Sequence, residues 1–220
     1  MNIIIVSAGE LSPDFLKTVY NDQSRTETPY VIGVDRGVLT CDAANVNIDY
    51  YIGDFDSVEE ADKLKIIKRA ADNGTVLNPV KDDTDTEHAV RYAVSLKPDN
   101  VVILGATGSR MDHTFTSIRL LKVFEDNGID AVILDEHNRI RVMDGRRGRI
   151  TFDKKNQYGY YVSVLPFAED LKHVNISGFK YDLKDWHIDM LAGLGVSNEI
   201  VSEEAYIEFE GCGIIMETKD

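Results

Sequence analysis

Short, continuously apolar runs recur through the first two thirds of this 220-residue chain, and segments with helical spacing follow several of them. Continuous apolarity is typical of strands that are covered on both faces, whereas half-exposed strands alternate apolar and polar residues. Strands alternating with helices predict a mainly parallel sheet with flanking helices. Gly74 and Gly128 stand where C-terminal helix caps are expected. We expect strands at residues 3–6, 30–34, 50–52, 75–77, 101–104 and 131–134, and helices at 58–73, 85–97 and 112–127.

The pattern changes after about residue 140. Apolar and polar residues alternate over 158–167, 173–183 and 205–209, and the last run turns at 211–213. This period of two predicts a smaller antiparallel β domain. A cluster of Gly and Arg at 146–148 interrupts the pattern, so we place the boundary there. Residues 1–145 are then the α/β domain, and residues 146–220 are the β domain.

The formal net charge of −14 argues against a nucleic-acid partner, because binding to a nucleic-acid backbone needs a basic surface. The apolar start is too short for a signal peptide, and no later run approaches membrane-spanning length, so we expect a cytoplasmic protein with no membrane partner. Cys41 and Cys212 lack metal-type spacing and are expected to be small buried hydrophobes. The negative charge also repels nucleotide phosphates, so a phosphate site here requires a metal ion or local cations.

The first of three polar junctions follows the third expected strand, where Gly53-Asp54-Phe55-Asp56-Ser57 leads into a helix. Ligands bind at this carboxyl edge of a parallel sheet. Two aspartates one residue apart can place two oxygen ligands near one divalent ion, as Mg²⁺ requires in nucleotide sites. The alternative is that Ser57 forms a capping box with Glu60 and that the aspartates only favour the helix N-terminus.

The second junction, Lys81-Asp82-Asp83-Thr84-Asp85-Thr86-Glu87, again lies between a strand and a helix. Thr84 and Glu87 have capping-box spacing, which accounts for those two residues. The capping box does not account for the three aspartates and the lysine at the same sheet edge as the first junction. Carboxylates gathered there repel one another unless a cation is bound. Two acidic clusters at one edge therefore predict a metal site.

The third junction, Gly105-Ala106-Thr107-Gly108-Ser109-Arg110-Met111-Asp112-His113, is a glycine loop between a strand and a helix. Glycines let backbone N–H groups approach phosphate, and the helix N-terminus adds a favourable dipole. The spacing matches neither the dinucleotide fingerprint nor the P-loop, so a generic turn is the alternative. Arg110 favours phosphate, since its guanidinium offers a bidentate contact, whereas His113 is expected to pack or cap.

These three motifs, in this order, closely resemble those of the thiamine pyrophosphokinase family. The resemblance extends over essentially the whole chain and continues in Asp35-Arg36-Gly37, Glu136-His137-Asn138 and Gly195-Val196-Ser197-Asn198-Glu199. Two positions depart from the family pattern. Arg36 stands where a glycine is common, and Ser109 stands where the family often has a second glycine before the arginine.

The resemblance implies an α/β nucleotide-binding domain, a C-terminal antiparallel β-sandwich that binds thiamine, and a homodimer with active sites shared between subunits. It also implies the reaction, in which ATP and thiamine give thiamine diphosphate and AMP. The thiamine hydroxyl attacks the β-phosphorus and AMP leaves. Such a transfer needs positioning and charge neutralisation, which suits a site with acidic metal ligands and no evident nucleophile paired with a base.

The resemblance also assigns roles to individual residues. Mg²⁺ would bind to Asp54, Asp56 and Asp85, with Asp82 as a further candidate. The nucleotide would be held by Asp35, Asp82, Gly105, Gly108, Arg110 and Asp112. Thiamine would meet Ser197 and Asn198, whose short polar side chains suit either directional hydrogen bonds or a turn. Trp186 is a candidate stacking residue, although a lone Trp is more often in a core.

Two other interpretations remain open at this point. The first is pyrophosphoryl transfer to a different hydroxymethyl heterocycle, such as a pterin, although the β domain with its Ser-Asn segment favours thiamine. The second is a nucleotide-binding regulatory module without catalysis. Asp54, Asp56 and Asp85 speak against it, because a binding module can hold phosphate without assembling so much negative charge.

Overall fold

The structure, a computed structural model, describes residues 1–56, 58–78 and 83–220. It divides into two compact units, Met1–Glu136 and His137–Asp220. The division comes earlier than the boundary expected at 145/146, because the strand at 138–144 pairs with a strand near the C-terminus and so belongs to the second unit. Among the described residues, no helix combines the length and the apolar character that crossing a membrane would require.

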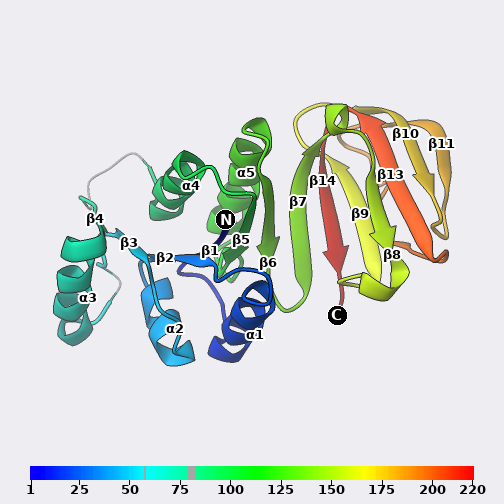
Figure 1. Ribbon diagram of the computed structural model, residues 1–220. Coiled ribbons are helices and arrows are strands. Elements are labelled where there is room, and N and C mark those ends of the chain that lie inside the picture. The colour runs from blue at the N-terminus through cyan, green and yellow to red at the C-terminus, as the bar shows by residue number, and fades with distance from the viewer. Residues whose placement is uncertain (57, 79–82) are drawn as a thin grey trace. The chain divides into compact units, whose positions relative to one another are not determined.

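A parallel sheet forms the centre of the first unit (Figure 1). Its strands lie in the order β6-β5-β1-β2-β3-β4, and neighbouring strands pair in parallel. The chain builds outward from β1 to β4 and then returns to the other side of β1 with β5. The direction of winding therefore changes between β1 and β5. The strands are β1 (Asn2–Val6), β2 (Tyr30–Val34), β3 (Tyr50–Gly53), β4 (Gly74–Val76), β5 (Asn100–Leu104) and β6 (Asp130–Leu134).

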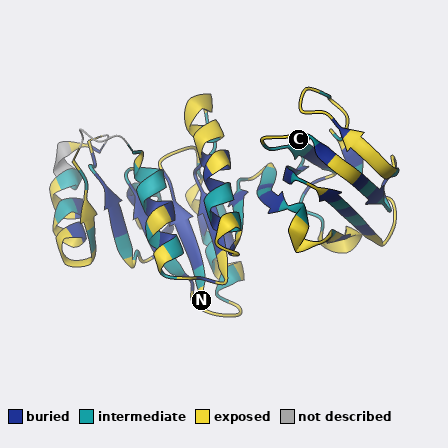
Figure 2. Cartoon of the chain, turned by 90° about the horizontal axis from the view of Figure 1, so that it is seen from above, coloured by how far each residue is buried: buried dark blue, intermediate teal, exposed yellow. Residues whose placement is uncertain are grey.

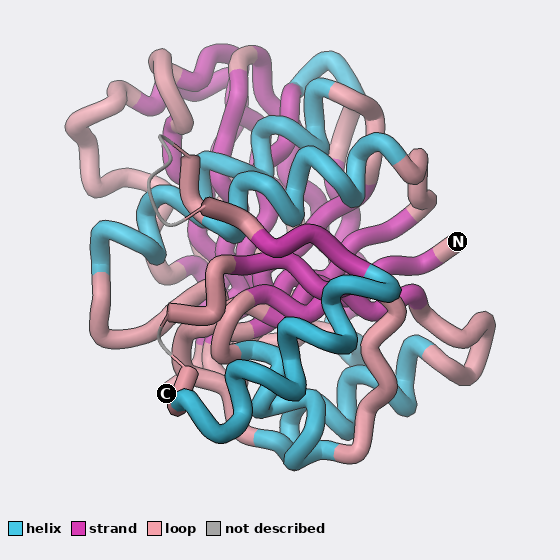
Figure 3. Tube along the Cα trace, turned by 90° about the vertical axis from the view of Figure 1, so that its left-hand side faces the viewer, coloured by secondary structure: helices cyan, strands magenta, loops and turns pink. Residues whose placement is uncertain are grey.

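Helices cover both faces of this sheet. Figure 1 shows α1 and α2 on one face and α4 and α5 on the other, and Figure 3 shows helices on both sides of the strands. Figure 2 shows helices that are buried along one side and exposed along the other, and the strands between them are buried, with Ile3 to Val6 at most 1% exposed. The helices are α1 (Pro13–Gln23), α2 (Gly37–Ala44), α3 (Glu60–Asn73), α4 (Asp85–Ser95) and α5 (Met111–Asp126).

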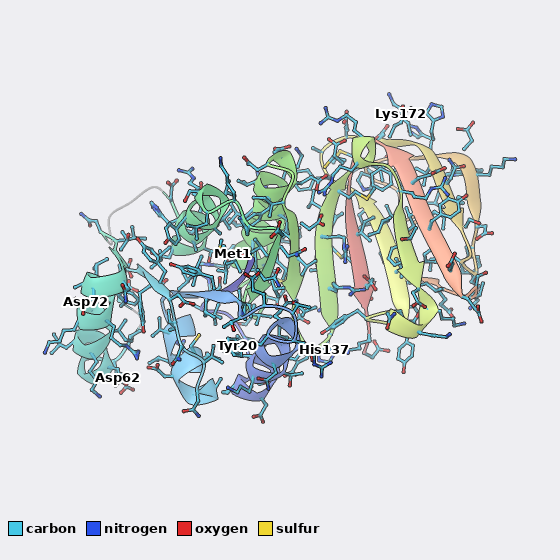
Figure 4. The ribbon with its side chains drawn as sticks, viewed as in Figure 1. Met1, Tyr20, Asp62, Asp72, His137 and Lys172 are labelled. Carbon is cyan, nitrogen blue, oxygen red and sulfur yellow. The ribbon has the colours of Figure 1, made fainter. Side chains whose placement is uncertain are left out.

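Local signals fix several helix ends. Thr84 caps α4 as predicted, since its hydroxyl accepts the Glu87 N–H at 3.2 Å. The helix expected at 58–73 begins at Glu60, and Ser57, its expected cap, lies outside the described residues. Gly74 ends α3 in an extended conformation and not in a left-handed cap, because it also opens β4. Figure 4 labels Asp62 and Asp72 on α3, whose charged side chains lie at the surface of the unit.

The second unit is an antiparallel β-sandwich. One sheet has the order β12-β9-β14-β7 and the other β11-β10-β13-β8. Buried residues from both sheets form one apolar core, with Leu171 and Val174 of β10 and Val162 and Ile215 of the facing sheet among them. The predicted antiparallel domain is confirmed. The strands are β7 (Asn138–Asp144), β8 (Ile150–Asp153), β9 (Tyr161–Pro166), β10 (Leu171–Ser177), β11 (Leu183–Ile188), β12 (Asn198–Glu199), β13 (Glu204–Glu210) and β14 (Cys212–Thr218).

Candidate active site

A cavity of about 660 Å³ opens at the carboxyl ends of the parallel strands in the first unit. Its walls come from the segments after β1, β2, β3 and β5 and from the start of α4. This edge includes the point between β1 and β5 where the winding direction changes, and such points form ligand crevices in α/β sheets. The lining residues include Ser7–Glu10, Val34–Arg36, Asp54, Asp56, Thr84–Thr86, Gly105–Arg110 and His113.

Three carboxylates meet on one side of this cavity. Asp35, Asp54 and Asp85 each offer an oxygen, and these atoms lie within 4.8 Å of one another. They come from the ends of β2 and β3 and the first turn of α4, so the sheet order brings together residues far apart in the sequence. Converging carboxylate oxygens are the donor set that Mg²⁺ prefers. The residues present therefore fit a magnesium ion.

The backbone around Asp35 holds its carboxylate toward the other two. Asp35 has a positive φ of 45°, its N–H donates to the Ile52 carbonyl at 3.0 Å, and its Oδ1 accepts the Phe55 N–H at 3.4 Å. A Cβ added at Gly53 would lie 2.2 Å from that Oδ1. Gly53 thus leaves room for the Asp35 carboxylate, and its own φ of 155° suits glycine.

The cluster is electrostatically unfavourable without a cation. Burial, followed by the charge and hydrogen bond of Asp85 and by the charge of Asp54, raises the pKa of Asp35 from 3.8 to about 7. The group therefore resists ionisation at a pH where a carboxylate is ordinarily charged. A divalent ion at the three oxygens would reverse this, because it favours the charged form of each ligand.

The predicted magnesium ligands are only partly brought together. Asp54 and Asp85 lie in the cluster, whereas Asp56 is exposed on the cavity wall and donates its N–H to Asp54 Oδ1 at 3.1 Å. Asp35, which the resemblance assigned to the nucleotide, takes the third place. Asp82 lies outside the described residues, so its role stays a prediction. Asp83 points elsewhere, to Arg91 at 3.3 Å.

Two further loops, residues 7–10 and 105–110, are hydrogen-bonded to each other and also line the cavity. Gly9 donates its N–H to the Gly105 carbonyl at 2.7 Å, and the Glu10 N–H donates to the Thr107 carbonyl at 2.9 Å. The Glu10 carboxylate then accepts the Ser109 N–H at 3.1 Å. A Cβ at Gly9 would lie 2.4 Å from the Thr107 oxygen, so only glycine permits this approach. Sequence analysis missed the Ser7–Glu10 loop, although a glycine shortly after the first strand was a usable signal.

Arg110 stands at the end of the glycine loop with its guanidinium already oriented. Its Nε and Nη2 donate to the two Asp112 oxygens at 3.3 and 2.6 Å. This pair lowers the pKa of Asp112, mainly through the hydrogen bond from Arg110. Arg110 is among the residues lining the cavity, and His113, expected to pack or cap, is half exposed on the same wall. Arg36, at a position where glycine is common in the resembling family, adds a second arginine to the lining.

In the second unit, the predicted thiamine segment is held by local hydrogen bonds. Asn198 is 7% exposed, and its Oδ1 accepts the N–H groups of Tyr181 and Glu199, each at 3.0 Å. Its Nδ2 donates to the Tyr181 carbonyl at 2.7 Å. Ser197 has a φ of 57° and donates its N–H to Ser163 Oγ at 3.0 Å. These contacts match the turn role, and Trp186 is 51% exposed and not in a core.

The comparisons of this chain with known proteins all identify the same family. The family model described as the thiamin pyrophosphokinase catalytic domain matches residues 22–133, and the one described as the thiamin pyrophosphokinase vitamin B1 binding domain matches residues 147–212. The chain is 33% identical to thiamine pyrophosphokinase of Bacillus subtilis over 217 residues, covering 98% of this chain and 96% of that protein.

Solved structures agree with these sequence matches. A crystal structure of the Bacillus subtilis enzyme superposes with a TM-score of 0.88 at 32% identity, covering 100% of both chains. That of thiamin pyrophosphokinase from Geobacillus thermodenitrificans gives 0.82 at 31% identity, covering 100% of this chain and 98% of the other. The yeast enzyme, at 16% identity and a TM-score of 0.74 over 98% of this chain and 85% of the other, shares the fold.

Proposed function

Because the chain belongs to the thiamine pyrophosphokinase family, we propose that it transfers the pyrophosphoryl group of ATP to the hydroxyl of thiamine. The products are thiamine diphosphate and AMP. Membership makes the chain a transferase of the pyrophosphokinase class. The observation that carries the proposal is the convergence of Asp35, Asp54 and Asp85 in one cavity with the Arg110 loop.

Mg²⁺ fits the three-carboxylate cluster, with Asp54 and Asp85 as ligands and Asp35 as the third. Asp56 lies two residues further along the loop, on the cavity wall, and donates its N–H to the Asp54 carboxylate. From there it can contact the ion through a water molecule. When bound, Mg²⁺ supplies Lewis-acid neutralisation of the phosphate oxygens. The positive charge of the ion offsets the repulsion between the negatively charged protein and the polyphosphate substrate.

The phosphates of ATP fit between the carboxylate cluster and the glycine loop. Arg110 can make a bidentate contact with a phosphate, and its pair with Asp112 holds the guanidinium plane in one orientation before ATP binds. The loop geometry that Gly9 and Gly105 allow keeps this wall rigid. Positioning of this kind reduces the entropy cost of bringing the attacking hydroxyl in line with the β-phosphorus.

In the proposed reaction, the thiamine hydroxyl oxygen forms a bond to the β-phosphorus, and the bond from that phosphorus to the α,β-bridging oxygen breaks. AMP leaves with the bridging oxygen, and the hydroxyl proton passes to solvent or to a nearby carboxylate. Phosphoryl-type transfer depends on charge neutralisation and alignment, not on a covalent intermediate. A cavity with carboxylates, an arginine and loop N–H groups offers these elements.

Thiamine recognition is proposed for the second unit, where the vitamin B1 binding model supports it. We assign the segment at Ser197 and Asn198 to this role, with the backbone and the Ser197 hydroxyl as contacts, because the Asn198 carbonyl is engaged with local N–H groups. The proposed assembly is a homodimer with sites shared between subunits. ATP as co-substrate, together with two free cysteines, favours the cytoplasm as the compartment.

A direct assay tests the proposed function. The protein is incubated with MgCl₂, ATP and thiamine, and AMP and thiamine diphosphate are separated and quantified. We expect both products in equal amounts, and Asp54→Asn and Asp85→Asn should each lower kcat by orders of magnitude. Asp62→Asn, on the surface of α3, is the matched control and should be unaffected. Product formation in the absence of any divalent ion, or normal turnover in both cluster variants, would contradict the metal assignment.

A further inference from the structure

Arg36 lines the candidate active-site cavity directly after Asp35, a member of the carboxylate cluster, and precedes the first residue of α2. Its φ and ψ of −61° and −19° are those of a helix, so the backbone here accepts a residue of any size. The side chain is exposed and makes no capping hydrogen bond to α2. Its guanidinium is therefore not required to shape the chain locally and is available to a ligand.

The backbone at Arg36 is held in place by its neighbours. A Cβ added at Gly37 would lie 2.1 Å from the Val6 carbonyl oxygen, so the start of α2 packs directly against the end of β1. The Leu39 N–H donates to the Arg36 carbonyl at 3.0 Å. These contacts fix the backbone of Arg36 at the carboxyl edge of the sheet, beside the strand where the winding direction changes.

The two arginines of the cavity lining differ in their pairing. Arg110 donates from Nε and Nη2 to both oxygens of Asp112. The Arg36 guanidinium, by contrast, forms no hydrogen bond or ion pair with any residue that the structure describes. The pKa of Asp35 is raised to about 7, so the arginine that follows it does not neutralise that carboxylate. A phosphate can therefore bind to Arg36 without breaking an existing ion pair, whereas at Arg110 it competes with Asp112.

The overall charge of the cavity determines which ligands Arg36 can help to bind. Within the described part of the chain, the lining contains five carboxylates and two arginines, so without a metal ion it repels an anion. A divalent ion at the three-carboxylate cluster offsets two of these negative charges and attracts the oxygens of a chelating ligand. A ligand with several phosphates therefore needs both the ion and an unpaired cation such as Arg36.

We propose that Arg36 binds the pyrophosphoryl group of ATP, with its guanidinium donating hydrogen bonds to oxygens of the β- and γ-phosphates. Magnesium in nucleotide sites bridges these two phosphates, and Arg36 directly follows Asp35 of the cluster that fits the ion. The planar fork of a guanidinium matches two phosphate oxygens at once. This inference rests on the proposed function and adds to it a residue that distinguishes ATP from AMP.

The contact has a consequence for the two products. The pyrophosphoryl group passes to thiamine, and AMP keeps only the α-phosphate. Arg36 therefore contacts the same group before and after the transfer, and it loses no contact when AMP leaves. Replacing Arg36 should weaken the binding of ATP and of thiamine diphosphate, and it should leave the binding of AMP unchanged.

Isothermal titration calorimetry of the full chain in MgCl₂ tests this by comparing α,β-methylene-ATP with AMP. The analogue carries a methylene group in place of the bridging oxygen at which AMP leaves, so it is not turned over. Arg36→Gln should weaken binding of the analogue by about tenfold or more, since a charge-assisted contact is lost, and should leave the affinity for AMP unchanged. Arg36→Lys keeps the charge without the planar fork and should give a smaller loss.

Arg25→Gln is the matched control, since Arg25 is exposed, does not line the cavity and pairs with Asp22 at 3.2 Å. It removes the same charge and should bind both ligands as wild type does. Equal affinities of wild type and Arg36→Gln for the analogue would overturn the inference and leave the proposed function standing. An equal loss for AMP and the analogue would place the contact on the α-phosphate and overturn the assignment to the pyrophosphoryl group. If wild type binds neither ATP nor the analogue, the proposed function fails together with the inference.

Discussion

Replacing Asp35 by Asn should stabilise the protein in the absence of metal while impairing its activity. In the folded state, the pKa of Asp35 is raised from 3.8 to about 7 by burial and by Asp85 and Asp54. At about 1.4 kcal/mol per pH unit, the difference corresponds to at most about 4 kcal/mol of destabilisation when the carboxylate is charged. Partial solvent access reduces this, and we expect a gain of about 2 kcal/mol in the free energy of unfolding. Asn keeps an oxygen to accept the Phe55 N–H.

The gain should depend on pH with a defined sign. Because the folded-state pKa is raised, the native protein binds the extra proton, and the stability associated with protonated Asp35 is fully present below about pH 4 and lost as pH rises to about 7. Wild type and Asp35→Asn should therefore have similar stability near pH 4. The difference between them should grow up to about pH 7 and level off above it.

Urea denaturation from pH 4 to 8, with EDTA and then with MgCl₂, measures this difference. Mg²⁺ binds to the folded wild type and raises its free energy of unfolding by mass action, whereas the variant has lost one ligand and should gain less. At saturating Mg²⁺, the difference in free energy of unfolding that favours Asp35→Asn in EDTA should therefore shrink or change sign. Asp62→Asn, which changes a surface carboxylate, controls for the loss of one negative charge. If Asp35→Asn is less stable than wild type in EDTA at pH 8, the folded protein stabilises the charged Asp35 carboxylate without a metal ion. That result would contradict the repulsion inferred between the clustered carboxylates.

The other predictions concern the loops and the second unit. Arg110→Lys keeps the charge but loses the planar fork, so KM for ATP should rise about tenfold or more in steady-state kinetics, with a smaller rise for Asp112→Asn. Glu10→Ala should raise KM for ATP while leaving KM for thiamine unchanged, because it frees the Ser109 N–H of the glycine loop. Asn198→Ala should lower the free energy of unfolding by about 1–3 kcal/mol in urea, since buried N–H groups lose their acceptor. Because Asn198 holds the proposed thiamine segment in place, Asn198→Ala should also raise KM for thiamine. Mixed Asp54→Asn and Asn198→Ala subunits should then regain activity if each active site is shared between subunits, and a verified heterodimer without recovery would refute the shared site.

Most of the sheet could be predicted from the sequence, because strands buried on both faces are apolar throughout. Two helices were not predicted. α2 is eight residues long and begins with glycine, and its apolar residues do not form a clear helical stripe, so the surrounding structure stabilises a helix that the local pattern only weakly specifies. α1 did carry a signal: Leu16 and Val19 are buried, Phe15 and Tyr20 pack against the same cluster, and Ser12 and Pro13 mark its start.

The sequence predicted the position of the candidate site at the carboxyl edge of the sheet and two of the three clustered carboxylates, Asp54 and Asp85, but not that Asp35 joins them. The aspartates after β3 and at the start of α4 were identified because each motif places carboxylates at a strand end. Asp35 was not predicted to join them, since that requires β2 and β3 to be neighbours, and sequence does not state strand order. The same limit applies to Glu10, whose partner Ser109 is far along the chain. Strand order, which creates both contacts, is a property of the folded sheet.

The motif Gly53-Asp54-Phe55-Asp56 shows why spacing alone does not bring both aspartates into the carboxylate cluster. Two aspartates separated by one residue were expected to converge on one ion, but Phe55 between them is fully buried with a positive φ of 54°, and this turn sends Asp56 outward to solvent. Asp56 contributes its N–H to Asp54 and so fixes the orientation of the inner carboxylate. Gly53 leaves the space that Asp35 fills. Each residue of the motif thus acts on the cluster in a different way, and the third carboxylate comes from the neighbouring strand.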